Sequence, residues 1–88
     1  GDLLPTPATL LRQLRTDGQL KLPDEAKADS AWVEVLARSL NLDSTLRVSL
    51  AGSQAEAWRE ALVNAGVRSS RLEVGTAATE GLHLELIR

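Results

Sequence analysis

The segment RVSLAGSQAEAW, residues 47–58, contains both patterns that decide the fold. In its first half the apolar residues Val48 and Leu50 alternate with polar residues, which is typical of a strand with one covered face. Gly52 then interrupts the alternation, and apolar residues recur at helical spacing after it. The segment therefore predicts a strand, over residues 45–51, that turns directly into a helix.

The predicted helix begins at a capping box, Ser53-x-x-Glu56, in which the two side chains bond the free N–H groups of the first turn. Its apolar stripe comprises Ala55, Trp58, Ala61, Leu62 and Ala65. Gly66 follows and can adopt the left-handed conformation that commonly ends a helix. We expect Trp58 to pack on the sheet as a core residue.

Three further strands are predicted on both sides of this segment. Gln19–Leu22 alternates polar and apolar residues until Pro23, which cannot donate a ladder hydrogen bond. Arg71–Val74 and Leu82–Ile87 show the same alternation, with the leucines of the last strand on one face. The residues GTAATEG, 75–81, are predicted to form a loop between these two strands.

Two helices are predicted before residue 47. The first covers about residues 7–16, with Thr6 as N-cap and Pro7 at its first position. The second covers residues 24–41, where the period of the apolar residues changes from two to about 3.6. Its stripe comprises Ala28, Ala31, Trp32, Val35, Leu36 and Leu40. We expect Trp32, like Trp58, to be a core residue.

The resulting order, α-β-α-β-α-β-β, predicts a single α+β domain over residues 1–88. Because each strand has one apolar face and each helix one apolar stripe, we expect a small mixed sheet of about four strands with two or three helices on one face. The other face of the sheet is then exposed to solvent. Its predicted residues are Arg47, Ser49, His83 and Glu85.

The composition excludes several classes of function. Ten basic and twelve acidic residues are mixed along the chain, so no basic surface is expected to attract nucleic acid. The absence of cysteine removes disulfides, thiolate catalysis and cysteine metal sites, and it leaves the compartment open, secreted or cytoplasmic. No stretch of about 20 apolar residues is present. Since the chain begins with glycine, we expect a domain cut from a longer protein, with any membrane segment outside it.

Few residues are candidates for chemistry. His83 is the only histidine, and Glu85 on the same face is its nearest expected carboxylate, but we interpret both as solvated strand residues. Asp24, Glu25 and Asp29 lack the ligand spacing of a calcium loop, and we interpret them as acidic residues that favour a helix start. We therefore predict no catalytic residue, no metal, no cofactor and no enzymatic activity.

The turn at Gly52 is the remaining candidate for a ligand or partner site. Strand-to-helix turns often bind anions at the helix N-terminus. One glycine without a following lysine is neither a phosphate loop nor a dinucleotide fingerprint. The candidate residues of this corner are Gly52, Ser53, Gln54 and Glu56.

The chain from about Gln19 to Arg88 resembles OmpA-like domains, the βαβαβ modules of cell-envelope proteins that bind peptidoglycan. The resemblance is based on AWVEVLARSLNLDSTLRVSLAG, on EALVNAGVRSSRLEVG and on GLHLELI. In that family an Asp and an Arg after the second strand hold the carboxylate of the wall peptide. Here Ser53 follows Gly52, and Gln54 occupies the Arg position, so the resemblance assigns no ligand residue.

The part from Thr45 to Arg88 also resembles the small periplasmic ferredoxin-like domains of secretion and pilus platform proteins. Those domains are not enzymes, and they pair with themselves or with one another. Together the resemblances imply a periplasmic or cell-envelope location, although a cytoplasmic one stays open. They predict a non-catalytic assembly module that binds a protein partner or its own copy. The alternatives are a peptidoglycan-binding domain with an altered site and, third, a small enzyme.

Overall fold

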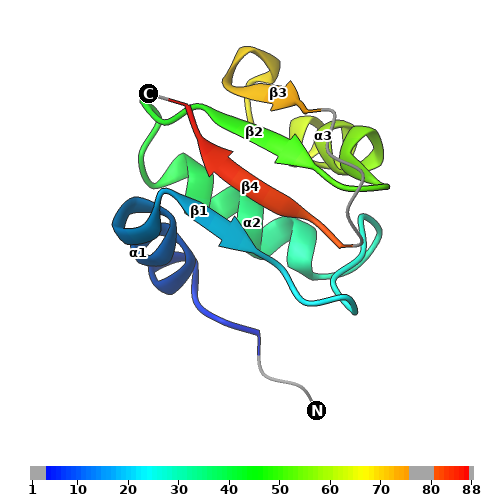
Figure 1. Ribbon diagram of the computed structural model, residues 1–88, viewed down its shortest axis with the longest axis horizontal. Helices are drawn as coiled ribbons and strands as arrows, with labels where there is room; N and C mark the ends of the chain where they lie inside the picture. The colour runs from blue at the N-terminus through cyan, green and yellow to red at the C-terminus, as the bar shows by residue number, and fades with distance from the viewer. Residues whose placement is uncertain (1–3, 76–80, 88) are drawn as a thin grey trace.

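The computed structural model describes residues 4–75 and 81–87 and has the predicted architecture, a four-stranded mixed sheet with helices on one face (Figure 1). Its elements in chain order are α1 (Pro7–Asp17), β1 (Gln19–Lys21), α2 (Trp32–Asn41), β2 (Val48–Ala51), α3 (Ala55–Asn64), the 3₁₀ turn η1 (Ser69–Arg71), β3 (Leu72–Val74) and β4 (His83–Leu86). The prediction of a small α+β fold is confirmed.

The strand order in the sheet is β1-β4-β2-β3. β4 lies between β1 and β2 and is antiparallel to both, whereas β3 runs parallel to β2 at the edge. Leu84 of β4 is directly opposite Leu20 on one side and Leu50 on the other, so one row of leucines crosses the sheet. In Figure 1 the sheet lies in front of α2, and α3 lies behind the β2–β3 side.

The core lies between this apolar face of the sheet and the three helices. Trp58 on α3 is its largest side chain and is 2 % exposed, as predicted, while Trp32 is half-buried against the core. The other core side chains are almost all leucine, valine or alanine. Dense packing of such aliphatic groups supplies most of the stabilisation that a domain of this size has.

The start of α1 and the end of α3 form as the sequence predicts. The Thr6 side chain accepts a hydrogen bond from the backbone N–H of Thr9, and Gly18 ends α1 with a φ of 72°. Gly66, with a φ of 107°, follows the end of α3, and the Val67 N–H reaches back to the Leu62 carbonyl at 3.0 Å. Both glycines are therefore required by the backbone conformation.

The predicted capping box is wrong. The N-cap of α3 is Gln54 and makes no side-chain cap bond, and Ser53 lies one residue too early. The backbone turn that starts at Gly52 satisfies the early N–H groups instead, because Ala55 donates to the Gly52 carbonyl at 3.2 Å. The regular helical bonds then begin with Trp58, which donates to the Gln54 carbonyl at 2.9 Å.

The predicted start of α2 at residue 24 is also wrong, since the helix begins at Trp32 and residues 24–31 form turns. The Ser30 hydroxyl explains the difference. It donates to the Lys27 carbonyl at 2.7 Å and accepts from the Lys27 N–H at 3.2 Å, and such local bonds compete with a helix. The interpretation of Asp24, Glu25 and Asp29 as acidic residues at a helix start is therefore wrong.

The segment between α2 and β2 is fixed by the buried side chain of Arg71, which is 7 % exposed. Its Nε donates to the Leu46 carbonyl at 2.9 Å, and Nη1 donates to Asn41 Oδ1 at 2.9 Å. Nη2 donates to the carbonyls of Leu40 and Asp43. Burial lowers the pKa of this guanidinium below its ordinary value, but an arginine stays charged in proteins. β2 therefore starts at Val48 and not at Thr45 as predicted, because the preceding carbonyls bond Arg71.

Asp43 connects the same segment to α1. Its carboxylate accepts hydrogen bonds from the Thr45 hydroxyl and from the Thr45 N–H, the latter at 3.1 Å, and it pairs with Arg15 of α1. The Thr45 hydroxyl, followed by Arg15, lowers the pKa of this carboxyl to about 2 from an ordinary 3.8. The Asp43 backbone and side chain thus join α1, the turn and Arg71.

We predict that Arg71→Met lowers the free energy of unfolding by about 3 kcal/mol, because several partly buried oxygens lose their donor. This loss is a large fraction of the roughly 5 to 10 kcal/mol expected for such a domain. Urea denaturation followed by the fluorescence of Trp32 and Trp58 measures it. The control is Arg68→Met, because Arg68 is exposed three residues earlier and its loss should stay within about 0.5 kcal/mol. Equal losses would contradict the structural role of Arg71.

We predict that the stability falls as the pH drops from about 4 towards about 2 in a manner that depends on Asp43. A carboxyl whose pKa is lower in the folded state, about 2 against 3.8, stabilises the fold above the unfolded value and loses that contribution as it is protonated. Asp43→Asn should flatten this part of the stability profile, and Thr45→Ala should flatten it less. If the pH profile of stability is unchanged in Asp43→Asn, the attribution of this pH dependence to Asp43 is wrong.

Candidate functional site

The predicted corner at Gly52 is a tight turn between the end of β2 and the start of α3. Gly52 adopts a φ of 131°, a conformation that side chains disfavour. Ser53 and Gln54 follow it and are exposed. Glu56, in the first turn of α3, is exposed too, but it lines a different hollow, next to β3. The structure therefore brings together three of the four predicted corner residues and separates the fourth.

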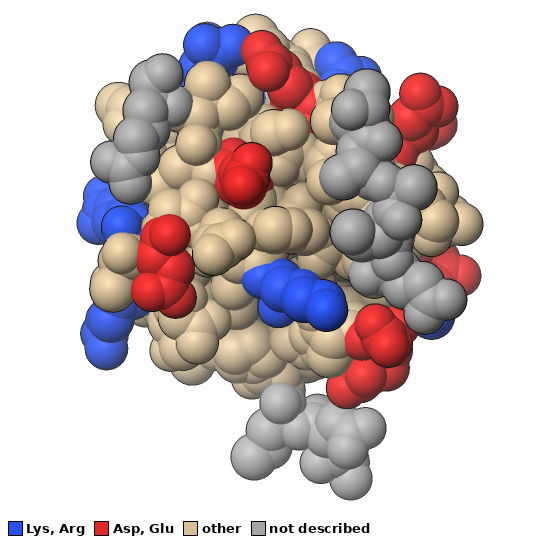
Figure 2. Space-filling model, in the orientation of Figure 1, with Lys and Arg blue, Asp and Glu red and all other residues tan. Residues whose placement is uncertain are grey.

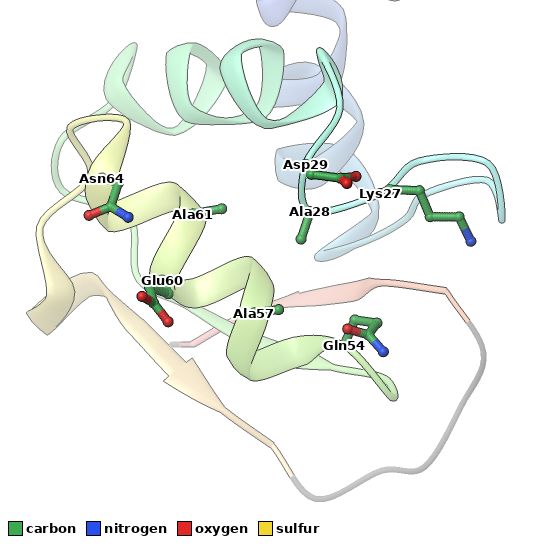
Figure 3. A pocket seen from close by; sticks show the side chains of 8 residues that line it. All are labelled: Lys27, Ala28, Asp29, Gln54, Ala57, Glu60, Ala61 and Asn64. Atoms are coloured by element: carbon green, nitrogen blue, oxygen red, sulfur yellow. The ribbon is translucent and has the colours of Figure 1, made fainter.

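An open hollow lies beside this corner, between α3 and the turns of residues 24–29 (Figure 3). Its volume is about 650 Å³. Ala57 and Ala61 lie on the side of α3 turned toward Ala28, whereas the Glu60 carboxylate points away from Lys27 (Figure 3). A smaller adjoining hollow of about 290 Å³ shares the Gln54 and Lys27 side chains and reaches Asp24 and Ser53.

The rim of these hollows mixes charges and neutral polar groups. Lys27 is the cation, and Gln54 and Ser53 supply an amide and a hydroxyl. The anions are Asp24, Asp29 and Glu60. Such a rim can hydrogen-bond a small polar or zwitterionic molecule. Within residues 4–75 and 81–87, no three His, Asp or Glu residues are grouped so as to hold a metal ion.

The uncovered face of the sheet carries the predicted residues Arg47, Ser49, His83 and Glu85. Ser49 is directly opposite Glu85 in the ladder, and Arg47 pairs with Glu73 of β3 at 3.0 Å. Figure 2, in the view of Figure 1, shows charged side chains spread singly over this face. The face is therefore a mixed polar surface.

His83 does not pair with Glu85 on this face. Its Nε2 lies 3.0 Å from Gln19 Oε1 of β1, and Ala51 and Lys21 are its partners across the sheet. An amide can hold the ring in place, but it cannot take up a proton as a carboxylate partner does. The structure thus places His83 beside a neutral group.

The edge strand β3 carries a surface that the sequence pattern does not predict. Its alternation suggests that Leu72 and Val74 are covered alike, yet Leu72 is 3 % exposed and Val74 is 39 % exposed. Both residues lie on the same edge strand, so the difference comes from what covers each position: Leu72 packs in the core, whereas Val74 lines an open hollow. The alternation within one strand does not contain this difference.

A second hollow of about 540 Å³ lies between this edge and α3. It is lined by Glu56, Arg59, Glu60, Val63, Ser69 and Val74. The Arg59 Nε donates to the Leu72 carbonyl at 3.3 Å, so a side chain of α3 already bonds the outer edge of β3. We call the outer edge of β3 together with this hollow the β3 groove.

No family model matches the chain. No helix in the described part of the chain is long and apolar enough to cross a membrane.

Proposed function

We propose that this domain is a non-catalytic protein-interaction module that takes an extended strand of a protein partner at the β3 groove. The observation that carries the proposal is the open outer edge of β3 beside the exposed Val74 side chain. An open edge offers unpaired backbone groups, and adding a strand to it is a common mode of peptide recognition.

The backbone direction of β3 supports strand addition. The Gly75 N–H donates inward to the Leu50 carbonyl at 2.7 Å. Because neighbouring residues of a parallel strand bond to opposite sides, the N–H and carbonyl of Val74 face outward. The bond from Arg59 to the Leu72 carbonyl agrees with this direction, since Leu72 lies two residues from Val74. Among residues 4–75 and 81–87, no partner bonds these two groups, so Val74 offers one donor and one acceptor to a new strand.

The hollow beside the edge supports side-chain recognition. Val63 on α3 is half-buried and lies with Val74 along this hollow. Every second side chain of an added strand points toward the helix side, where it would contact these two valines. The backbone then supplies affinity and the hollow supplies selectivity.

The setting that we propose is a bacterial cell-envelope complex, such as a secretion or pilus machine. It is based on the resemblance to periplasmic platform domains and to OmpA-like modules. The element order from β1 to β4, without α1 and η1, is the βαβαββ order expected for residues 19–88. The platform domains that the chain resembles pair with themselves or with one another, and the β3 groove is the surface that we assign to a partner contact.

We predict that Val74→Pro abolishes binding of a strand-forming peptide, acetyl-Thr-Val-Thr-Val-Thr-amide, to the domain. Proline removes the outward N–H of residue 74 and leaves the inward bond of Gly75 to Leu50 intact. NMR titration of the labelled domain should show peptide-dependent shifts at residues 72–75, and the affinity of the variant should fall at least about tenfold.

The matched control is Val74→Thr, which keeps the N–H and the β-branched shape, and it should bind like the original chain. The urea midpoints of both variants show whether the fold is retained. If the proline variant binds the peptide as well as the control, the added strand does not use the β3 edge and the proposal is wrong.

A second candidate function is binding of a peptidoglycan peptide at the corner hollow. The observation that favours it is the rim of Lys27, Asp24 and Gln54 beside the turn where the OmpA-like family binds its ligand. Lys27 could bond a carboxylate, and Asp24 could bond an amine, of a zwitterionic wall peptide. This candidate uses the side of α3 turned toward residues 27–29, and Glu60 lines both this hollow and the β3 groove.

The corner candidate predicts that a soluble muropeptide shifts the amide signals of residues 52–54 and leaves residues 72–75 unchanged. Lys27→Gln should weaken that binding about fivefold or more, because it removes a charge-assisted hydrogen bond. Gln13→Glu on α1, remote from the corner, serves as a surface control. An unchanged spectrum at millimolar muropeptide would remove the candidate.

A further inference from the structure

We propose that the strand bound at the β3 groove carries lysine or arginine at the positions that face α3. The inference rests on the proposed function and adds the chemistry of the partner. It follows from two carboxylates, Glu56 and Glu60, that line the same hollow as Val63 and Val74. The β3 groove thus combines an apolar floor with an acidic wall.

The acidic wall, which consists of Glu56 and Glu60, is electrostatically unfavourable in the free domain. Glu56 and Glu60 lie four residues apart on α3, so they share a helix face and repel each other. Both are exposed, and within the described residues neither forms an ion pair with a lysine or arginine. A cation placed between them relieves the repulsion and gains an attraction to each carboxylate.

Arg59 lies between these two residues in the sequence and lines the same hollow. Its Nε already donates to the Leu72 carbonyl at 3.3 Å on the β3 side. This bond turns the guanidinium toward the strand edge and leaves both carboxylates to the solvent. The hollow therefore keeps an unmatched negative charge next to an open strand edge.

The shape of a lysine or arginine side chain suits this site. A strand added to β3 lies about 4.8 Å from it, and its side chain opposite Val74 points to the helix side. The aliphatic stem would contact Val74 and Val63, while the charged head reaches Glu56 and Glu60, as long basic side chains commonly do at the rim of apolar surfaces. A glutamate at this position would meet two like charges.

The same charges argue against a symmetric partner. If two copies paired β3 with β3 about a two-fold axis, each copy would bring its own Glu56 and Glu60 to the shared groove. Four carboxylates would then gather along one seam, and like charges there are destabilising. We therefore expect the β3 groove to bind a strand other than β3 of a second copy, in which basic and neutral residues alternate.

The test uses three peptides that differ only at alternate positions: acetyl-Thr-Lys-Thr-Lys-Thr-amide and its counterparts with Glu or Val in place of Lys. NMR titration of the labelled chain at low salt gives the affinities and the residues that shift. The Lys peptide should bind about tenfold tighter than the Glu peptide, with shifts at residues 72–75 and at Glu56 and Glu60. This preference should shrink at higher ionic strength.

The variant that tests the acidic wall is Glu56→Gln combined with Glu60→Gln, which should bind the Lys and Glu peptides about equally. Glu25→Gln with Glu34→Gln changes the net charge by the same amount away from the groove, and it should keep the preference. Sedimentation velocity on the chain alone should show no β3-dependent dimer.

The outcomes separate the two proposals. Equal binding of the Lys and Glu peptides at residues 72–75 overturns the basic partner and leaves strand addition intact. If the Glu56→Gln, Glu60→Gln variant still prefers the Lys peptide to the Glu peptide, the basic partner is also overturned, because other residues would then recognise the charge. If none of the three peptides shifts residues 72–75, both strand addition and the basic partner are overturned.

Discussion

The buried guanidinium of Arg71 is the interaction on which the packing of the other elements depends. Arginine is suited to this place because its planar group carries five N–H donors in a fixed arrangement. Here those donors bond oxygens at the end of α2 and in the turn that leads to β2. Asn41 extends the network to α3, because its side-chain amide donates to the Gly66 carbonyl at 3.2 Å. One side chain at the start of β3 thus positions the ends of two helices.

The sequence predicts most of the elements because they follow simple periodic patterns. Val48 and Leu50 alternate with polar residues in β2, and Thr6 and Gly66 mark helix ends that the structure confirms. These features depend on neighbours in the sequence alone. The patterns fail where a side chain bonds the local backbone, as Ser30 does before α2. They also fail where a distant side chain bonds a predicted strand, as Arg71 bonds the Leu46 carbonyl.

The candidate site could be predicted only in part, for a related reason. The turn at Gly52 is visible in the sequence, but the hollow beside it exists because residues 24–29 fold back over α3. The β3 groove depends on the strand order, in which β4 inserts between β1 and β2 and leaves β3 outside. No pattern within one strand contains that order. The exposure of Val74 and the shared hollow of Glu56 and Glu60 are therefore properties of the tertiary structure.

The central position of β4 also constrains how the chain folds. β1 and β2 are not neighbours, and each pairs with β4, whose residues 83–86 come after both in the chain. During synthesis the β2–α3–β3 unit can close first, since its contacts are local. β1 pairs only with β4, which lies more than sixty residues later in the chain: Lys21, for example, is opposite His83. Closing so long a loop is slow. The sheet is therefore completed only after residues 83–86 have left the ribosome.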